Sequence, residues 1–293
     1  MNALPLPPRT LVALAVTGVV GLLIFLWPLS LTAPTGEVAH VPVVLGAVLV
    51  LVLVVLLVAL SDGGIDVKAV ALLGLLAAVG AILRPLAAGT AGIETVFLPL
   101  VLGGRVLGPG FGFVLGSTTL FSSALLTGGV GPWLPYQMLA ASWLAMGAGL
   151  LPRAVRGRRE IAMLVGYGAV ASVVYGMAMN FSFWPFQLGL GTELSFVPGA
   201  PAGENLHRFL VYSLATSLVW EIGRATTTAV GIVLLGRPVL ATLRRGATRA
   251  GFAPARAGSS GARPERPARA GSAAGLPDGP PRTGGAGVPP GDG

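Results

Sequence analysis

The sequence has no cysteine and few charged residues. The absence of cysteine among its 293 residues excludes a disulfide framework, a thiolate metal site and a cysteine nucleophile. Only 10% of the residues are charged, whereas a soluble domain carries about 25%. Of all residues, 54% are hydrophobic and the mean hydropathy of the chain is +0.81, so the chain cannot expose enough polar surface to remain in water. The composition predicts an integral membrane protein.

Catalytic motifs are also missing. The sequence holds two histidines and shows no His-Glu helix motif, no nucleophile elbow and no paired intramembrane carboxylates. The run GPGFG at residues 108–112 lacks the spacing of a dinucleotide-binding loop and the Lys-Ser/Thr of a phosphate-binding loop. We therefore expect no catalytic residue, no metal site and no cofactor, and the protein is predicted not to be an enzyme.

Long apolar runs predict an all-α membrane protein with about eight transmembrane helices. Seven runs are long enough to cross about 30 Å of hydrocarbon; they are residues 11–29, 41–60, 69–86, 110–126, 133–151, 161–183 and 209–235. A shorter run, 93–107, contains Pro99 and Arg105 and either spans as a short helix or re-enters on one side. The first run could instead be a signal peptide, but it exceeds the usual apolar core of about 7–15 residues, so we expect an uncleaved span.

Basic residues orient the predicted spans. Most arginines lie in the loop RAVRGRR, residues 153–159, and after residue 236. With eight spans and both termini in the cytoplasm, this loop, Arg9, Lys68 and Arg105 all lie inside, as the positive-inside rule requires. A seven-span count places Arg9 and Lys68 outside and fits less well. The net charge of +8 thus indicates membrane orientation rather than nucleic-acid binding.

The composition of the chain changes after residue 245. Residues 246–293 are rich in Ala, Gly, Pro and Arg, and they cannot bury enough apolar surface to offset their chain entropy. We expect a disordered cytoplasmic tail, although a basic tail that recruits partners to a membrane scaffold is an alternative.

Polar and aromatic residues gather near the predicted outer ends of the core helices. The uncharged stretch LTGGVGPWLPYQ, residues 126–137, connects two spans there. An aromatic belt explains some of these residues, whereas apolar walls with a few polar groups are typical of a small-molecule pocket. The candidate substrate-binding residues are Arg84, Trp133, Tyr136, Gln137, Trp143, Asn180 and Trp184.

Glu221 and Arg224 are the charges that lie well inside a long span. Intramembrane charges face protein or water, and an i, i+3 spacing allows these two to pair. The pair either locks the last helix into the bundle or serves as a ligand clamp or proton relay.

Small residues line the first core helix. Ala77 and Ala81 are four apart, beside Gly74 and Ala78. Such stripes allow close helix approach, either within the protein or at a docking face for a partner.

Three small-residue stretches follow the alanine-rich helix in a fixed order: GGRVLGPGFGFVLG (103–116), QMLAASWLAMGAGLLP (137–152) and WEIGRATTTAVGIVLLGRPVL (220–240). With these stretches, this part of the chain resembles the substrate-binding S components of energy-coupling factor (ECF) vitamin transporters. The resemblance covers roughly residues 68–245, which hold six of the eight predicted segments and match the six-helix core of the family. The resemblance implies that residues 68–245 form a substrate-binding membrane core. It also implies that residues 1–67, with the runs 11–29 and 41–60, form an N-terminal membrane addition of two helices, which departs from the plain family pattern.

The resemblance implies a transport function. An S component binds a vitamin or a vitamin precursor at its outer face, works with a transmembrane coupling protein and a pair of cytoplasmic ATPases, and topples in the membrane to deliver the ligand. It also implies that the small-residue stripe is the docking face for the coupling protein. A large corrinoid is one conceivable substrate. The alternative function is a proton-coupled secondary transporter that uses Glu221 and Arg224.

Overall fold

The computed structural model describes residues 8–26, 28, 46, 50, 54, 67–87, 90–187 and 192–249. Most of the predicted span 41–60, and the predicted tail from residue 250 onward, therefore lie outside the described residues.

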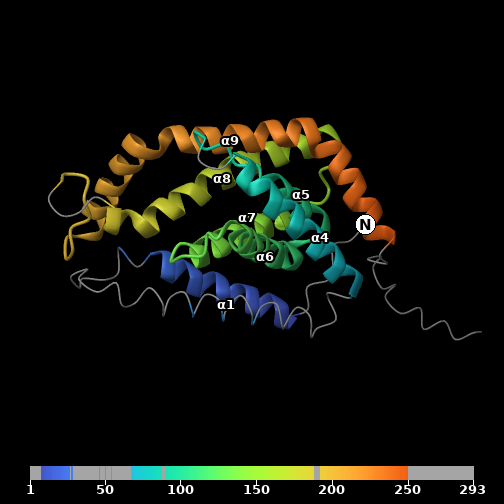
Figure 1. The fold of residues 1–293 in the computed structure, drawn as a ribbon, viewed down its shortest axis with the longest axis horizontal. Coiled ribbons are helices and arrows are strands. Elements are labelled where there is room, and N and C mark those ends of the chain that lie inside the picture. Colours follow the sequence, from blue (N-terminus) through green and yellow to red (C-terminus); the bar gives the residue numbers. More distant parts are fainter. Residues whose placement is uncertain are drawn as a thin grey trace, which may run out of the picture. The chain divides into compact units, whose positions relative to one another are not determined.

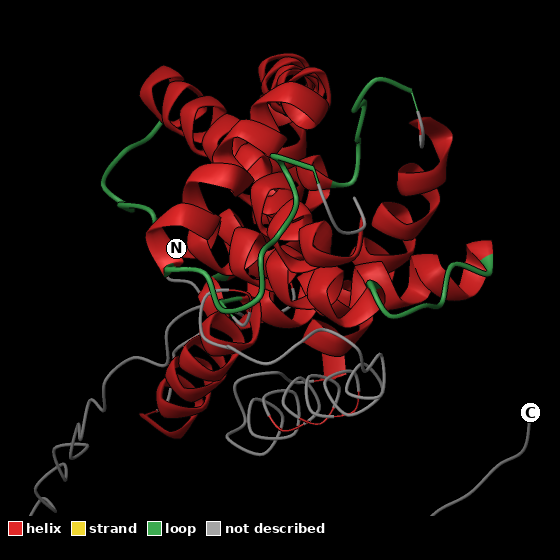
Figure 2. Ribbon diagram, turned by 90° about the vertical axis from the view of Figure 1, so that its left-hand side faces the viewer, coloured by secondary structure: helices red, strands yellow, loops and turns green. Residues whose placement is uncertain are grey.

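Every regular element in the described part of the chain is a helix (Figure 2). The elements are α1 (Pro8–Phe25), α4 (Val67–Leu83), the 3-10 helix η2 (Arg84–Ala87), α5 (Phe97–Leu107), α6 (Pro109–Thr127), α7 (Leu134–Leu150), α8 (Arg158–Gln187) and α9 (Ala202–Arg249). This arrangement agrees with the predicted all-α class.

Four of the described helices are long and apolar enough to cross a membrane. They are the segments Lys68–Leu86, Pro109–Thr127, Arg158–Pro185 and Ala202–Thr248. These four candidate spans are fewer than the eight that the sequence predicts. The count of about eight spans stays a prediction. The predicted span 209–235 is only part of α9, whose 48 residues extend over about 72 Å if straight.

The run 93–107 forms a helix only from Phe97 onward. Helix α5 has 11 residues and is about 16 Å long, roughly half of the hydrocarbon thickness. Residues 90–96 before it form a loop, and Gly108 alone separates α5 from α6. Nine of the residues of α5 are buried. It is thus a short helix enclosed by its neighbours rather than a complete span.

Helix α7 packs against α5, α6 and α8, while α9 packs along α8 (Figure 1). Helices α6 and α7 approach closely because α6 presents glycines to α7. A Cβ atom on Gly112 would overlap the backbone of Ala145, and one on Gly116 would overlap the backbone of Ala141. Since lipid tails are as apolar as leucine, such close van der Waals packing, rather than the hydrophobic effect, holds helices together in a bilayer.

Helix α1 precedes the predicted core and packs on α7. The ring of Phe25 lies edge-on to Tyr136 at 5.3 Å between centroids and 5.4 Å from the ring of Trp143. At least one part of the N-terminal addition therefore contacts the core directly.

One end of the bundle is closed by an ion-pair network. We call it the arginine-loop end, because it holds the loop 151–157 between α7 and α8. Arg105 Nε and Arg244 Nη2 both donate to Oε1 of Glu160, at 2.8 and 2.6 Å. Arg105 also donates to the carbonyl oxygens of Leu151, Pro152 and Val155. The loops 90–96, 128–133 and 192–201 lie at the opposite end of the bundle, because the helices that they join run toward or away from that end.

Candidate functional site

Arg224 on α9 is the centre of a charged cluster at the opposite end of the bundle. Its Nη1 donates to Oε2 of Glu221 at 2.8 Å, and its Nε lies 3.3 Å from Oε2 of Glu94. The guanidinium also lies over the ring of Tyr175, 5.9 Å from its centroid. The side chains of Arg224 and Glu221 are 12% and 7% exposed, so two carboxylates and an aromatic face compensate a largely buried cation.

Gly176 on α8 makes room for the ion pair. A Cβ atom there would overlap Nη1 of Arg224 and both carboxylate oxygens of Glu221. The absence of a side chain at this position lets the two charged groups lie against the backbone of α8. The pair thus occupies the interface between α8 and α9.

The loop 90–96 brings Glu94 to Arg224. Its turn places Ala91 at φ 43° and Gly92 at φ 76°, a left-handed backbone that alanine adopts only at a cost. A Cβ atom on Gly92 would overlap the carbonyl of Trp220, and one on Gly223 would overlap the carbonyl of Ala91. The backbone of the loop therefore rests directly on the backbone of α9.

A second arginine adjoins the cluster from η2. Arg84 Nη2 donates to Oε1 of Gln137 at 2.9 Å, and Arg84 also interacts electrostatically with Glu94. The cluster thus contains two arginines and two glutamates, contributed by η2, the loop 90–96 and α9.

A polar cavity of about 320 Å³ opens beside the ion pair. Its lining residues come from α8 and α9: Asn180, Tyr212, Thr216, Ser217, Trp220, Glu221 and Arg224. The buried Nδ2 atom of Asn180 has no hydrogen-bond partner among the described residues. A buried amide donor without a partner is costly, so this atom would gain a hydrogen bond from a ligand.

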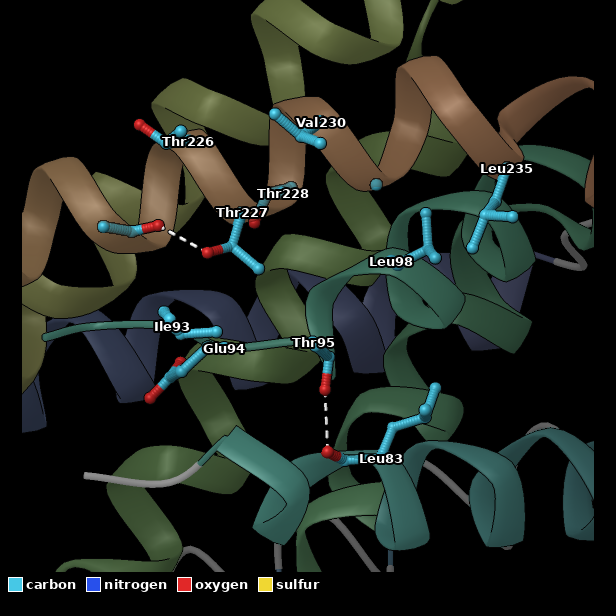
Figure 3. Close-up of a pocket in the computed structure, with 12 residues that line it drawn as sticks. Leu83, Ile93, Glu94, Thr95, Leu98, Thr226, Thr227, Thr228, Val230 and Leu235 are labelled. Carbon is cyan, nitrogen blue, oxygen red and sulfur yellow. Dashed lines mark hydrogen bonds between the residues drawn. The ribbon is translucent and has the colours of Figure 1, made fainter. Parts of the chain in front are cut away.

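A more apolar cavity of about 610 Å³ lies between the loop 90–96 and α9. Figure 3 shows Ile93, Glu94 and Thr95 on one side and Thr226 to Thr228 on the other. Thr95 Oγ1 donates to the carbonyl of Leu83 at 2.7 Å, which ties this loop back to α4 (Figure 3). A third, largely apolar groove of about 570 Å³ lies among α1, α7, α8 and α9.

A family comparison covers the residues of this cluster. Residues 68–236, more than half of the chain, match the family model described as ECF transporter, substrate-specific component. The chain belongs to this family. It is therefore a subunit of a membrane transporter and not an enzyme, in agreement with the resemblance seen in the sequence. Comparison with curated proteins and with solved structures gave no match.

The structure brings together only some of the predicted substrate-binding residues of this S component. Arg84 and Gln137 bond to each other, and Asn180 lines the polar cavity beside Glu221. Trp143 instead lines the groove next to α1.

The remaining predicted aromatic residues lie elsewhere. Trp133 is 44% exposed, and its Nε1 donates to the carbonyl of Gly129 in its own loop. Tyr136 packs between Phe25 and Phe183. Trp184 is fully buried and donates to the carbonyl of Leu194 at 2.7 Å. Of the described cavities, none has these three residues in its lining. A role for Trp133 as a lid over the ligand stays a prediction.

Burial separates the four predicted docking residues into two pairs. Ala77 and Ala81 are 4% and 0% exposed, so these two side chains pack within the protein. Their role in docking stays a prediction. Gly74 and Ala78 lie on the exposed face of α4, and a Cβ atom on Gly74 would meet nothing within 4 Å. The resemblance pointed first to the alanine pair, because spacing alone does not tell which side of an apolar helix is buried.

Sequence reasoning missed the connection between Glu94 and Arg224. Glu94 is the only acidic residue between residues 67 and 159, and an isolated carboxylate in an apolar region is expected to have a cationic partner. That signal was available, whereas the roles of Tyr175 and Gly176 follow only from the packing of α8 on α9.

Proposed function

We propose that the protein is the S component of an ECF importer that binds a vitamin or a vitamin precursor at its outer face. The observation that carries the proposal is the polar cavity between α8 and α9, which lies within the residues matched by the family model. Its converging hydrogen-bonding and charged groups can fix the orientation of a small molecule, and the aromatic rings of Tyr212 and Trp220 can cover its faces.

The arginine distribution sets the proposed orientation. The exposed residues Arg153, Arg156, Arg158 and Arg159 lie at the arginine-loop end, together with the C-terminal part of α9. By the positive-inside rule this end faces the cytoplasm. The polar cavity then opens near the outer side, and both termini lie in the cytoplasm.

The proposed partners are a transmembrane coupling protein and a pair of cytoplasmic ATPases. The chain has no phosphate-binding loop of its own, so ATP would be bound by separate subunits. We place the docking face for the coupling protein on the exposed side of α4, at Gly74 and Ala78. Small residues there allow the backbone of a partner helix to approach closely.

Within the cavity, different residues offer a ligand different polar groups. Asn180 offers a buried donor, and the hydroxyls of Thr216 and Ser217 lie 3.1 Å apart on α9. Arg224 is held in place by Glu94, Glu221 and Tyr175, so it needs little reordering when a ligand arrives.

The experiment that tests the proposal is the identification of a retained ligand, followed by uptake measurements. The protein is purified in a mild detergent and then denatured to release any bound ligand. Mass spectrometry of the released material should detect a vitamin-like small molecule. Uptake of that molecule should stop when the ATPase subunits are deleted. Uptake that persists without the ATPases but stops with an uncoupler would favour the alternative, a proton-coupled transporter that uses Glu221 and Arg224.

A further inference from the structure

The charges around the polar cavity are balanced. The two charged residues in the lining of the cavity, Glu221 and Arg224, pair with each other. Beside them, Glu94 contacts Arg224 and interacts electrostatically with Arg84, so two arginines offset two glutamates. The nearest charged group along α9 toward its N-terminus is Arg208, which pairs with Glu204 at 2.9 Å. The cluster therefore holds no net charge for a ligand to neutralise.

A ligand with a net charge would leave one charge uncompensated in this environment. The side chain of Glu221 is 7% exposed, and the low dielectric of such a site makes an unpaired charge costly. A ligand without net charge avoids that cost. Such a ligand can still interact with both charged residues of the lining, through a donor to Glu221 and an acceptor to Arg224.

The size of the cavity favours a small ligand. Its volume of about 320 Å³ lies at the lower end of the range of about 300–1,000 Å³ that ligand sites occupy. A corrinoid, with its macrocycle and side chains, exceeds this space. The polar groups of Asn180, Thr216 and Ser217 favour a ligand with several hydrogen-bonding atoms.

We infer that the substrate is a small molecule, zwitterionic or uncharged, that presents a hydrogen-bond acceptor to Asn180 and Arg224 and a donor to Glu221. This inference rests on the proposed function and names the substrate class of the same cavity.

The first test uses probes that differ chiefly in charge. The full-length protein in lipid nanodiscs is titrated with three pairs: nicotinamide and nicotinate, pyridoxine and pyridoxal 5′-phosphate, and pantothenol and pantothenate. Cyanocobalamin is added as the large probe, and thermal unfolding reports binding. We expect a neutral probe to stabilise the protein, with its charged counterpart binding at least about tenfold more weakly. Stronger binding of a charged probe or of cyanocobalamin would overturn the inference, as would the absence of binding in all three pairs.

The second test changes the charge of the site. Glu221→Gln leaves the cluster with one excess positive charge, so the ratio of affinities should shift toward the anionic member of the pair by about tenfold. Glu204→Gln, in the exposed pair on the same helix, is the matched control and should leave the ratio unchanged. If Glu221→Gln does not shift the ratio, the inference fails. Asn180→Ala gives a second measure, because it should weaken the neutral probe without changing any charge.

The two proposals can fail separately. A net-charged substrate whose uptake requires the ATPases would overturn the inferred substrate class and leave the transport function in place. A protein that retains no small molecule and supports no ATPase-dependent uptake would overturn both.

Discussion

Oε2 of Glu94 lies 3.3 Å from Nε of Arg224, although 130 positions separate the two residues in the sequence. The contact joins the loop 90–96 to the last helix at the polar cavity. A ligand that binds Arg224 through a negatively charged atom therefore competes with Glu94 for the guanidinium. Such a ligand would weaken the ion pair that helps hold the loop 90–96 on α9.

Gly176→Ala should disrupt the ion pair. The new Cβ atom would overlap Nη1 of Arg224 and the carboxylate of Glu221, so the helices must separate or the pair must move. We expect a loss of about 1–3 kcal/mol in the free energy of unfolding, as is usual for overpacking. Gly166→Ala is the control on the same helix, because nothing lies within 4 Å of its Cβ position. Denaturant unfolding in mixed micelles compares the two, and equal effects would contradict the proposed contact.

Glu160→Gln should destabilise the arginine-loop end. It removes the carboxylate that Arg105 and Arg244 share, and Arg105 is only 3% exposed. Loss of one partner from a buried pair costs about 3–5 kcal/mol, whereas loss of the exposed Glu204–Arg208 pair costs at most about 1 kcal/mol. The fall in thermal stability should therefore be much larger for Glu160→Gln than for Glu204→Gln. A similar fall in both variants would show that the network contributes little.

Asn180→Ala should weaken substrate binding more than Trp133→Ala. Asn180 lines the polar cavity with an unpartnered donor, whereas Trp133 is 44% exposed and bonds within its own loop. Loss of one hydrogen bond to a neutral ligand corresponds to roughly 0.5–1.5 kcal/mol, or up to about tenfold in affinity. Calorimetric titration with the retained ligand measures both variants. If Trp133→Ala has the larger effect, the loop 126–137 covers the ligand after all.

Substitutions on the exposed side of α4 should affect binding of the coupling protein, whereas substitutions on its buried side should affect the stability of the fold. Gly74→Leu and Ala78→Leu add bulk to the exposed face, so they should reduce co-purification of the coupling protein and leave stability nearly unchanged. Ala77→Leu and Ala81→Leu add bulk at buried positions and should lower the free energy of unfolding by about 1–3 kcal/mol. If Gly74→Leu and Ala78→Leu both bind the coupling protein normally, the docking surface does not lie on this face of α4.

The sequence predicted the class and the family better than the site. Apolar runs and charge placement were enough for an all-α membrane protein, because the bilayer restricts which segments can be buried. The spacing of Glu221 and Arg224 also predicted that they could pair. The run 93–107 was ambiguous by sequence, since only packing decides that a helix of 11 residues is enclosed by its neighbours.

Side-chain environments within the apolar helices were harder to predict. In a lipid environment, an exposed face and a buried face are both apolar, so Ala77 and Ala78 look alike in the sequence. Trp133 and Trp184 both lie near predicted outer ends of core helices, yet one is 44% exposed and the other is fully buried. Long-range contacts such as that of Gly176 with Arg224 depend on how α8 and α9 are aligned, which no local pattern specifies.

Glu160 accepts hydrogen bonds from α5 and α9 through a single oxygen atom, while Arg105 also binds three carbonyl groups of the loop after α7. Separating α5, α8 and α9 at this end would break both ion pairs of Glu160. If the protein reorients in the membrane during transport, we expect this end to move as one unit. We then expect the change of shape that admits and releases the substrate at the other end, where a loop rests on α9 through its backbone.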